Sequence, residues 1–475
     1  MDDAIVGLLA DGTLTFREME KASFDAVKDE FRRGLVELLE KVDQYLMEAR
    51  DTSRYENRGF EDRELETVVG LVRFKRRRYR DREDGRDVYL LDERLGIVRR
   101  KTVSGGIAEL MVLWSVKGPS YRDARDRLHE SSGYQVVSHE WGRQQTLRLA
   151  EAVRARDAQL ASKGAGERRA GGLFLEADGV WASLQGACGG KREAKVVVAH
   201  EGWQVRQGRG ATSDYKLVRP RYFSGLGAAE ELWERVRGSL AGEYADLDRT
   251  LVVLNGDDAA WIERGREHFG TCLYQRDRYH VTRDVAQALG GQPRHRRAAM
   301  AALRVNDIDR VAGELGEARR ESGPGPVSER QAQLEVALAR DADKIVDYRV
   351  RLSQVGYQVP ASWRGMGAAE ATVKRYKHRI AKHGRSWSVR GLEAILTLQD
   401  KLYDGTLVDT VKGLSLESQP QLQPQAVAGL LPREVPLAVG RGSHGARAGH
   451  FPTLDGATTA YSRMFRRLID AREPH

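Results

Sequence analysis

Apolar and polar residues alternate with different periods along the chain, which divides it into a helical beginning, a strand-rich middle and a helical remainder. Between residues 15 and 50, apolar side chains recur three or four positions apart, as at Phe24, Val27 and Phe31. This spacing predicts one long amphipathic helix that packs on another part of the chain. We therefore expect residues 1–66 to form a helical N-terminal region.

A strand-like pattern follows between residues 67 and 91, where two runs flank a turn at Asp84 and Gly85. An Asp-Gly pair between such runs predicts a β-hairpin. Its first strand mixes aromatic residues with basic ones and includes Arg76, Arg77 and Arg78. Such a surface suits contact with a phosphate backbone, although an edge strand kept soluble by its charges would carry the same pattern.

Two helical runs separated by a Ser-Ser-Gly turn lie within residues 118–151, and Ser138 is placed to cap the second helix. This arrangement is typical of a helix-turn-helix, in which the start of the second helix enters the major groove of DNA. A plain helical hairpin has the same pattern. With the basic hairpin before it, we expect residues 67–162 to form a DNA-binding domain. The residues expected near the bases are Ser138, His139, Trp141, Arg143 and Gln144.

Beyond a polar linker at residues 163–171, the chain changes to strands. The segment GLFLEADGVWASLQ predicts a buried strand on which Glu176 and Asp178 point to the same face. A second apolar run, TLVVLN, ends just before Asp257 and its neighbour. Strands that alternate with helices predict an α/β core at residues 171–290. A buried carboxylate is costly unless it is paired or bound to a cation, although a lone aspartate can also cap a turn.

The remainder of the chain has a helical period. Residues 291–365 are rich in alanine and arginine and predict a helical insertion. We expect residues 366–413 to complete the core, with Glu370 in the first turn of a helix that also carries Lys374 and Arg375. An acidic residue at that position commonly interacts with the helix dipole. Residues 414–475 become rich in Gln and Pro and then in Gly and Arg, so we expect a linker and a docking tail.

Composition limits the class of protein. The chain has 78 Lys and Arg residues against 69 Asp and Glu residues, a net charge of +9, which favours a polyanionic partner. Its two cysteines, Cys188 and Cys272, exclude a disulfide framework and a four-cysteine zinc site. No apolar run approaches the roughly 20 residues of a membrane span, and the acidic N-terminus does not resemble a secretory signal. We expect a cytoplasmic protein with no membrane partner.

Three carboxylates in similar settings suggest a common site. If the two apolar strands are neighbours and the later helix packs against them, Asp178, Asp257 and Glu370 converge. Like charges this close need divalent cations to stay ionised, and oxygen ligands that face phosphate substrates select Mg²⁺ or Mn²⁺. Two such ions about 4 Å apart would support phosphodiester cleavage.

Several segments carry a family resemblance. The segments EADGVW, LNGDDAAWI, DRYH and GAAE, followed by WSVRG, resemble the DDE transposases of bacterial insertion sequences, closest to the ISLre-type family, which is distantly related to the Mutator group. The likeness also includes RFKRRRY, LLDERLGI and SYRDA and spans most of residues 15–400. It implies an RNase H-like catalytic fold, preceded by a mainly helical DNA-binding region with a β-hairpin and interrupted by a helical insertion before the glutamate.

The resemblance also assigns residues. It implies that Asp178, Asp257 and Glu370 form the DDE triad, and that Asp277 and His280 have an auxiliary role. Asp258 stands where the family tends to have glycine, which leaves the second carboxylate open between two adjacent aspartates.

The expected function is that of a DNA transposase. It would bind the terminal inverted repeats of its insertion sequence, cut them with Mg²⁺ or Mn²⁺ and join the 3′ ends to target DNA. Chemistry on two ends implies a homodimer or a higher oligomer on double-stranded DNA, associated with the nucleoid. The alternatives are a catalytically inactive, domesticated transposase that acts as a DNA-binding regulator, and a structure-selective nuclease.

Overall fold

The computed structural model describes residues 15–98, 102–161, 166–186, 189–206, 214–382 and 384–416. The chain divides into two compact units, residues 1–149 with 408–475 and residues 150–407. The division follows Leu149, upstream of the linker expected at residues 163–171, part of which lies outside the described residues. The expected C-terminal tail also lies outside them from residue 417 onward.

The first unit begins with the long helix α2 (Phe16–Ala49), as predicted. Thr15 starts it with a capping box, because its side chain accepts the N–H of Glu18 while the Glu18 carboxylate accepts the N–H of Thr15. The second half of α2 is buried against a sheet, where Leu39 packs with Phe74 and Leu91. In the first half of α2, large apolar side chains such as that of Phe16 are exposed.

The sheet of this unit is a hairpin of β1 (Tyr55–Thr67) and β2 (Gly70–Asp81), to which β3 (Asp87–Val88) adds two residue pairs. The helical region expected over residues 1–66 therefore ends earlier, because β1 occupies its last part. The β1 sequence, YENRGFEDRELET, is almost entirely polar because most of this strand is exposed, so it lacks the apolar alternation of a half-buried strand. The main turn of the hairpin precedes Gly70, whose φ of 109° suits glycine.

Helices complete the first unit: α3 (Leu90–Leu95), α4 (Gly105–Lys117), α5 (Tyr121–Ser132), the first part of α6 (His139–Ala161), and α17 (Leu407–Leu416). The predicted helix pair is confirmed as α5 and α6. Gly133 ends α5 with a φ of 84°, and the Ser138 hydroxyl accepts the N–H of Trp141 at 3.0 Å to start α6. Helix α6 extends eleven residues beyond the predicted end near Ala150, to Ala161.

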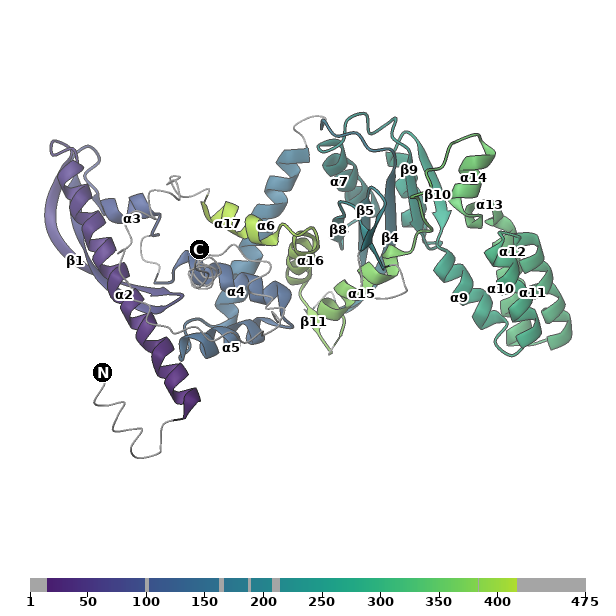
Figure 1. Ribbon diagram of the computed structural model, residues 1–475, viewed down its shortest axis with the longest axis horizontal. Helices are drawn as coiled ribbons and strands as arrows, with labels where there is room; N and C mark the ends of the chain where they lie inside the picture. Colours follow the sequence, from purple (N-terminus) through teal and green to yellow (C-terminus); the bar gives the residue numbers. More distant parts are fainter. Residues whose placement is uncertain are drawn as a thin grey trace, which may run out of the picture. The chain divides into compact units, whose positions relative to one another are not determined.

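The second unit contains a mixed sheet (Figure 1), with strands in the order β10-β9-β4-β5-β8. Strands β9 and β10 run parallel to β4, whereas β5 runs antiparallel to both β4 and β8. The bounds are β4 (Leu173–Leu184), β5 (Gly190–His200), β8 (Arg221–Gly225), β9 (Val252–Gly256) and β10 (Cys272–Arg276). The condition stated for convergence of the carboxylates is met, because β4 pairs directly with β9.

Two short pairings border this sheet. β11 (Ser386–Trp387) pairs in parallel with the end of β4, while β6 (Trp203–Arg206) and β7 (Asp214–Leu217) form a separate hairpin. The run EAKVVVAHEGWQV, residues 193–205, has the pattern of one continuous strand, but the structure breaks it after His200. Gly202, with a φ of 121°, lies at the break and permits the turn into β6.

The two faces of the sheet pack on different helices. On one face, Leu175 and Val197 form a core with Trp233 of α7 (Ala229–Ala241). Successive strand residues point to opposite faces, so the other face carries Glu176 and Asp178, and α15 (Ala368–Ile380) packs there. The remaining helices of this core are α8 (Ala260–Glu263), the 3₁₀ helix η2 (Arg264–His268) and α16 (Val389–Tyr403).

The predicted helical insertion is confirmed between β10 and α15. Within the predicted bounds of 291–365 lie α10 (Pro293–Arg304), α11 (Ile308–Ser322), α12 (Pro326–Arg340), α13 (Ala342–Ile345) and α14 (Tyr348–Gln354). Helix α9 (Arg278–Ala288), which was assigned to the core, precedes them and packs with them (Figure 1). The helices share an apolar core that includes Val285 and Leu315. A buried ion pair ties the insertion to the sheet, with Arg276 Nη1 lying 2.6 Å from Asp341 Oδ2.

Candidate metal centre

Asp178 lies on the central strand β4, where it is 8% exposed. Its Oδ1 accepts the N–H of Gly179 at 2.7 Å. A side chain at residue 179 would meet the Glu193 carboxylate of the neighbouring strand, so the small residue lets β4 and β5 pair beside the carboxylate. The sequence Asp-Gly therefore places one acidic group on the buried sheet face.

His280 reaches the same face from the first turn of α9. Asp277 caps this helix by accepting the N–H of Tyr279 at 3.1 Å. The second carboxylate oxygen of Asp277 lies 2.7 Å from Nδ1 of His280. Because Nδ1 is engaged, Nε2 is the ring nitrogen left to act in the centre.

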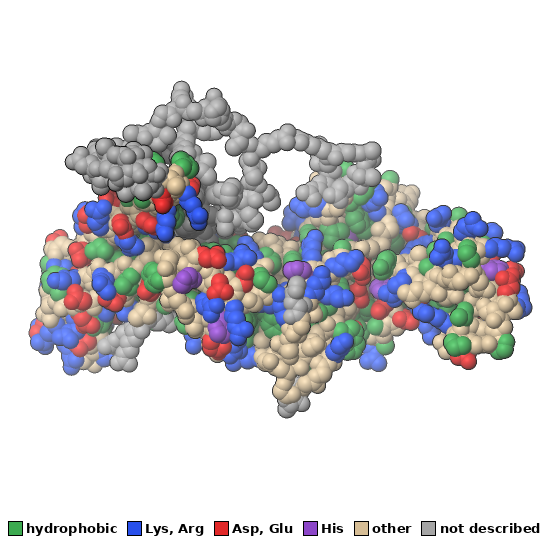
Figure 2. All heavy atoms as spheres, turned by 90° about the horizontal axis from the view of Figure 1, so that it is seen from below, with side chains coloured by type: hydrophobic (Ala, Val, Ile, Leu, Met, Phe, Trp, Pro, Cys, Tyr) green, Lys and Arg blue, Asp and Glu red, His purple; other side chains and the backbone are tan. Residues whose placement is uncertain are grey.

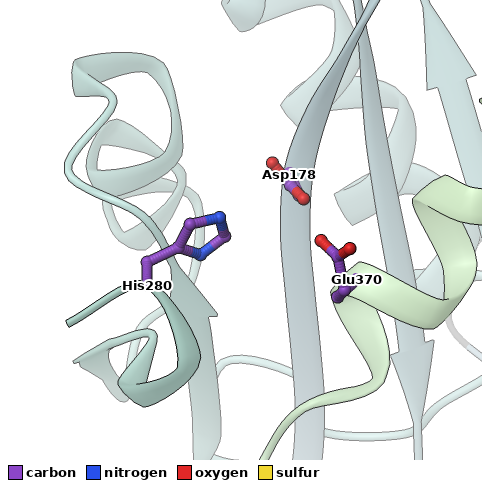
Figure 3. Close-up of side chains that lie close together, drawn as sticks. All are labelled: Asp178, His280 and Glu370. Atoms are coloured by element: carbon purple, nitrogen blue, oxygen red, sulfur yellow. The ribbon is translucent and has the colours of Figure 1, made fainter. Parts of the chain in front are cut away.

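Glu370 comes from the first turn of α15, on the far side of the insertion. The Asp178 carboxylate, the His280 imidazole and the Glu370 carboxylate each offer an atom within 4.8 Å of the other two. Figure 3 shows the three side chains directed into one space from β4, α9 and α15. Two carboxylates and an imidazole at this spacing are a donor set for a divalent cation.

The electrostatics of the centre follow from burial and charge. Burial raises the pKa of Asp178 to about 6, the charges of Asp257 and Glu370 add to the rise, and the N–H of Gly179 and the charge of His280 oppose it. The pKa of His280 is raised, first by its hydrogen bond to Asp277. A bound cation would reverse the first effect, since it favours the ionised form of Asp178.

Asp257, expected as the second ligand, is not among the three groups within 4.8 Å, where His280 takes its place. Its Oδ1 accepts the N–H of Ala259 at 3.0 Å, which turns the carboxylate toward the start of α8. Its charge nevertheless acts on Asp178. Asp258 is exposed and contacts Arg276 at 3.2 Å, so of the two adjacent aspartates Asp257 is the one coupled to the centre.

Glu176 is a buried carboxylate that the sequence argument left without a role. One of its oxygens accepts the N–H groups of Ala368 and Ala369, at 2.7 and 3.3 Å, at the start of α15. Its other oxygen lies 3.3 Å from His200 Nε2. Glu176 thereby fixes the turn of α15 that carries Glu370. In the sequence, its two-residue spacing from Asp178 was the one signal that Glu176 lies on the same sheet face.

A second buried carboxylate holds the middle of α15. The hydroxyl of Tyr376 donates to Asp400 Oδ1 at 2.7 Å, and the N–H of Ser224 donates to Asp400 Oδ2 at 2.9 Å. Burial raises the pKa of Asp400 to about 7. The helix that supplies Glu370 is therefore attached to both β4 and α16.

The basic hairpin differs from the expected DNA surface at Arg76 and, in part, at Arg77. Arg76 is 4% exposed, forms an ion pair with Asp92 and stacks on Tyr89, so its predicted role as a surface DNA contact was wrong. The cause is the strand period, which turns Arg76 to the buried side of β2. Arg77 is bound to Asp43 at 2.8 Å, whereas Arg78 is exposed.

The start of α6 carries an acidic residue among the predicted base-reading groups. Arg143 and Gln144 both donate to Glu140, at 2.8 and 2.9 Å. These hydrogen bonds lower the pKa of Glu140 to about 2. His139 is half-buried, and Ser138 is used as the cap. The side chains of Arg143 and Gln144 are thus held by Glu140 of the same helix.

Basic residues on α15 lie next to the centre. Lys374 Nζ is 3.3 Å from the Glu370 carboxylate, and Arg375 is exposed beside Tyr403. Figure 2 shows Lys and Arg side chains interspersed with Asp and Glu side chains on the visible face. On that face the positive charge is spread over the surface rather than gathered in one band.

Comparison with known proteins gives the family. A family model described as "Uncharacterised protein family (UPF0236)" matches residues 9–415. The chain belongs to the UPF0236 family. All three catalytic candidates, Asp178, Asp257 and Glu370, lie within the matched region.

Individual UPF0236 relatives cover most of the chain. The "UPF0236 protein in vanSb 3'region" of Streptococcus gallolyticus is 27% identical over 398 residues, which cover 82% of this chain and 83% of that relative. "UPF0236 protein TTE2489" of Caldanaerobacter subterraneus is 25% identical over 384 residues, 80% of this chain and 75% of that relative.

Another UPF0236 relative from Caldanaerobacter subterraneus has a name that joins eleven locus designations, from TTE0033 to TTE2212. It is 24% identical over 302 residues, which cover 63% of this chain and 59% of that relative. In the part of this chain that the structure describes, no helix combines the length and the hydrophobicity needed to cross a bilayer.

Proposed function

We propose that this protein is a DDE-type DNA transposase that cuts the inverted-repeat ends of its own element and joins them to target DNA with a divalent metal ion. The observation that carries the proposal is the convergence of Asp178, His280 and Glu370 on one sheet face, from segments far apart in the chain. Asp178 is buried, and a buried carboxylate is costly to ionise without a cation, so its burial beside Glu370 favours a metal-binding role over a structural one.

The sheet supports an RNase H-like core. Its first three strands, β4, β5 and β8, are antiparallel neighbours, and β9 and β10 then extend the sheet in parallel on the other side of β4. Such a core carries its first acidic residue on the central strand, the position of Asp178. The insertion between β10 and α15 agrees with the resemblance drawn from the sequence.

The donor set fits a hard divalent cation. Asp178 and Glu370 supply oxygen ligands of the kind that Mg²⁺ and Mn²⁺ prefer, with Asp257 near enough to add its charge. One or two such ions supply activation of an attacking oxygen and stabilisation of a leaving oxygen at phosphorus. The imidazole nitrogen of His280 would make Mn²⁺ the better fit of the two ions if it binds directly.

The protein's own groups have separate parts in this proposal. Asp277 holds His280 in one orientation through Nδ1, which leaves Nε2 as the ring nitrogen available to a cation. Glu176 fixes the start of α15 and so the position of Glu370. Lys374, beside Glu370, offers a positive charge to the DNA strand.

The names of the relatives add an independent argument. One relative is named for eleven loci of Caldanaerobacter subterraneus, and another is named for four. A protein encoded at many loci is what an element that inserts copies of itself leaves behind. We therefore propose that the gene for this chain lies in a mobile element. The protein would act on the two ends of that element as a dimer or a higher oligomer. The predicted helix-turn-helix, α5 and α6, would recognise those ends.

Metal-dependent cleavage tests the proposal. The wild type and Asp178→Ala would be incubated with duplex DNA that contains the ends flanking the gene, with Mg²⁺ or Mn²⁺. Asp309→Ala, an exposed carboxylate on the insertion, is the matched control. We expect nicking at the 3′ ends by the wild type and the control, and none by Asp178→Ala, which should still bind DNA.

Other outcomes select the alternatives. Specific binding of these ends without cleavage by any variant would favour a DNA-binding regulator. Cleavage of branched duplexes regardless of their end sequence would favour a structure-selective nuclease. Failure to bind or cut any DNA would refute the proposal.

A further inference from the structure

A hollow of about 860 Å³ opens where α9, the end of α10, α14 and the segment leading into α15 meet. Three arginines line it, Arg278, Arg304 and Arg349. The other polar groups include the side chains of Asn306, Ser353 and Gln354. None of its nine lining residues is aromatic. We call this feature the arginine hollow.

The arginine hollow is joined by the backbone to the candidate metal centre. Arg278 directly follows Asp277, whose carboxylate holds His280. Gly365, also in the lining, stands shortly before the helix turn that carries Glu370. The same two segments therefore build one wall of the hollow and deliver two of the three groups of the centre.

The lining has an excess of positive charge. Arg349 is paired with Asp347, whose carboxylate lies 2.9 Å from Nη2 and is the one acidic group in the lining. Arg278 donates to neutral oxygens, those of Asn306 and Leu303, which fix its position without cancelling its charge. Arg304 is exposed at the end of α10, and within the described residues no acidic group pairs with it. Three guanidinium groups against one carboxylate leave a net excess of two positive charges.

We infer that the arginine hollow binds the sugar-phosphate backbone of the DNA strand next to the scissile phosphate. Guanidinium groups bind phosphate oxygens through paired N–H donors, and the hydroxyl and amide groups of Ser353 and Gln354 suit the remaining oxygens. Without an aromatic side chain there is no platform on which a base can stack, so the contact is independent of base sequence. This inference rests on the proposed function and adds to it the surface along which the cleaved DNA strand runs.

The salt dependence of DNA binding tests it. Binding of a labelled duplex would be measured at several salt concentrations with Ca²⁺ as the divalent ion, for the wild type and for Arg304→Ala. Each phosphate contact contributes a slope of about 0.9 to the plot of log affinity against log salt concentration. We expect Arg304→Ala to lower the slope by about one contact and to lose affinity several-fold at low salt.

Two further variants control the measurement. Arg304→Lys retains a positive charge and should keep the wild-type slope. Arg320→Ala removes an exposed arginine at the other end of the insertion, in the last turn of α11, and should also keep it. The loss in Arg304→Ala should be equal for a duplex with the element end and for an unrelated duplex of the same length.

The failures of the two proposals are distinguishable. If the wild type binds DNA and Arg304→Ala binds with the same slope, the arginine hollow is not a strand site, while the transposase proposal stands. A loss confined to the element end would overturn the sequence-independent backbone contact. If the wild type binds neither duplex, the proposed function fails and this inference fails with it.

Discussion

The carboxylate of Glu176 accepts the N–H of Ala368 at 2.7 Å, and Glu370 follows two positions later in the same helical turn. A buried acidic group on the central strand thus fixes the backbone that presents another acidic group to the candidate metal centre. Glu176 also lies two positions before Asp178 on β4, so one short stretch of strand carries one candidate ligand, Asp178, and the support for another, Glu370.

Two replacements of Glu176 distinguish the hydrogen bonds that support α15 from the charge of the carboxylate. Glu176→Ala leaves the N–H groups of Ala368 and Ala369 and the His200 ring without this acceptor, so we expect the free energy of unfolding to fall by about 1–3 kcal/mol. Glu176→Gln keeps an acceptor oxygen and should lose less. Urea unfolding at neutral pH measures both, and equal stability of the wild type and Glu176→Ala would contradict this role.

His280 and Asp277 should act as one unit. Because Asp277 orients the ring through Nδ1, we expect Asp277→Asn to lower metal-dependent nicking about 10–100-fold. His280→Ala should lower it at least as much, and the double variant should be no worse than His280→Ala. Single-turnover rates of nicking for the wild type, the two single variants and the double variant give a double-mutant cycle. Losses that multiply in the double variant would mean that the two residues act independently.

The adjacent aspartates are expected to differ. Asp257→Ala should abolish nicking, since Asp257 is electrostatically coupled to Asp178. Asp258→Ala should leave the rate within about threefold of the wild type, because Asp258 is exposed and contacts Arg276. The same end-cleavage assay compares them, and a reversed order of the two losses would assign the second carboxylate to Asp258.

Asp400 gives a pH dependence of stability. Its pKa is about 7 in the folded protein against an ordinary value of 3.8, so the folded state binds the proton more tightly than the unfolded state. The contribution of Asp400 to the free energy of unfolding is fully present below pH 4. It is lost as the pH rises through 7, by about 3–5 kcal/mol in total. Burial is the main cause of the raised pKa of Asp400, the charge of Asp404 adds to it, and Arg235 and the hydrogen bonds from Ser224 and Tyr376 oppose it.

The difference between the wild type and Asp400→Asn isolates that group. Unfolding free energies at pH 5, 6, 7 and 8 should fall more steeply with pH in the wild type than in Asp400→Asn, which carries no proton to lose. Parallel pH profiles of the two proteins would show that Asp400 keeps an ordinary pKa.

Arg76 and Arg78 should have opposite phenotypes. Arg76→Ala leaves Asp92 buried without its partner, and we expect a loss of about 3–5 kcal/mol in unfolding free energy. Arg78→Ala, at an exposed position, should leave stability unchanged and weaken DNA binding. Unfolding and DNA-binding measurements on both variants check this, and a stable Arg76→Ala that binds DNA poorly would restore Arg76 as a surface contact.

Sequence patterns were most informative where burial imposes a period. The apolar runs of β4 and β9 predicted two buried strands, and the structure shows both of them in one sheet. The strand β1 was missed because exposure of most of its residues removes the apolar alternation. Burial of Arg76 was missed for a related reason, since its partner Asp92 lies on a separate helix that sequence spacing does not reveal.

At the candidate site, the sequence predicted that Asp178 and Glu370 converge, which the geometry confirms. It expected Asp257 as the third close group and gave His280 only an auxiliary role. The direction of the Asp257 side chain depends on a local hydrogen bond to the N–H of Ala259, and the position of His280 depends on how the insertion packs on β10. Neither relationship is encoded in residue spacing.

The helical insertion between β10 and α15 has a consequence for the order of folding. The three groups of the centre stand about 100 and about 90 positions apart along the chain, so each must wait for a long segment to fold before it meets the others. During synthesis Asp178 and His280 emerge first, and Glu370 follows only after the insertion. A nascent polypeptide that stops before α15 therefore has no assembled centre, and a protein able to cut DNA would become reactive only after the segment that carries Glu370 has been made.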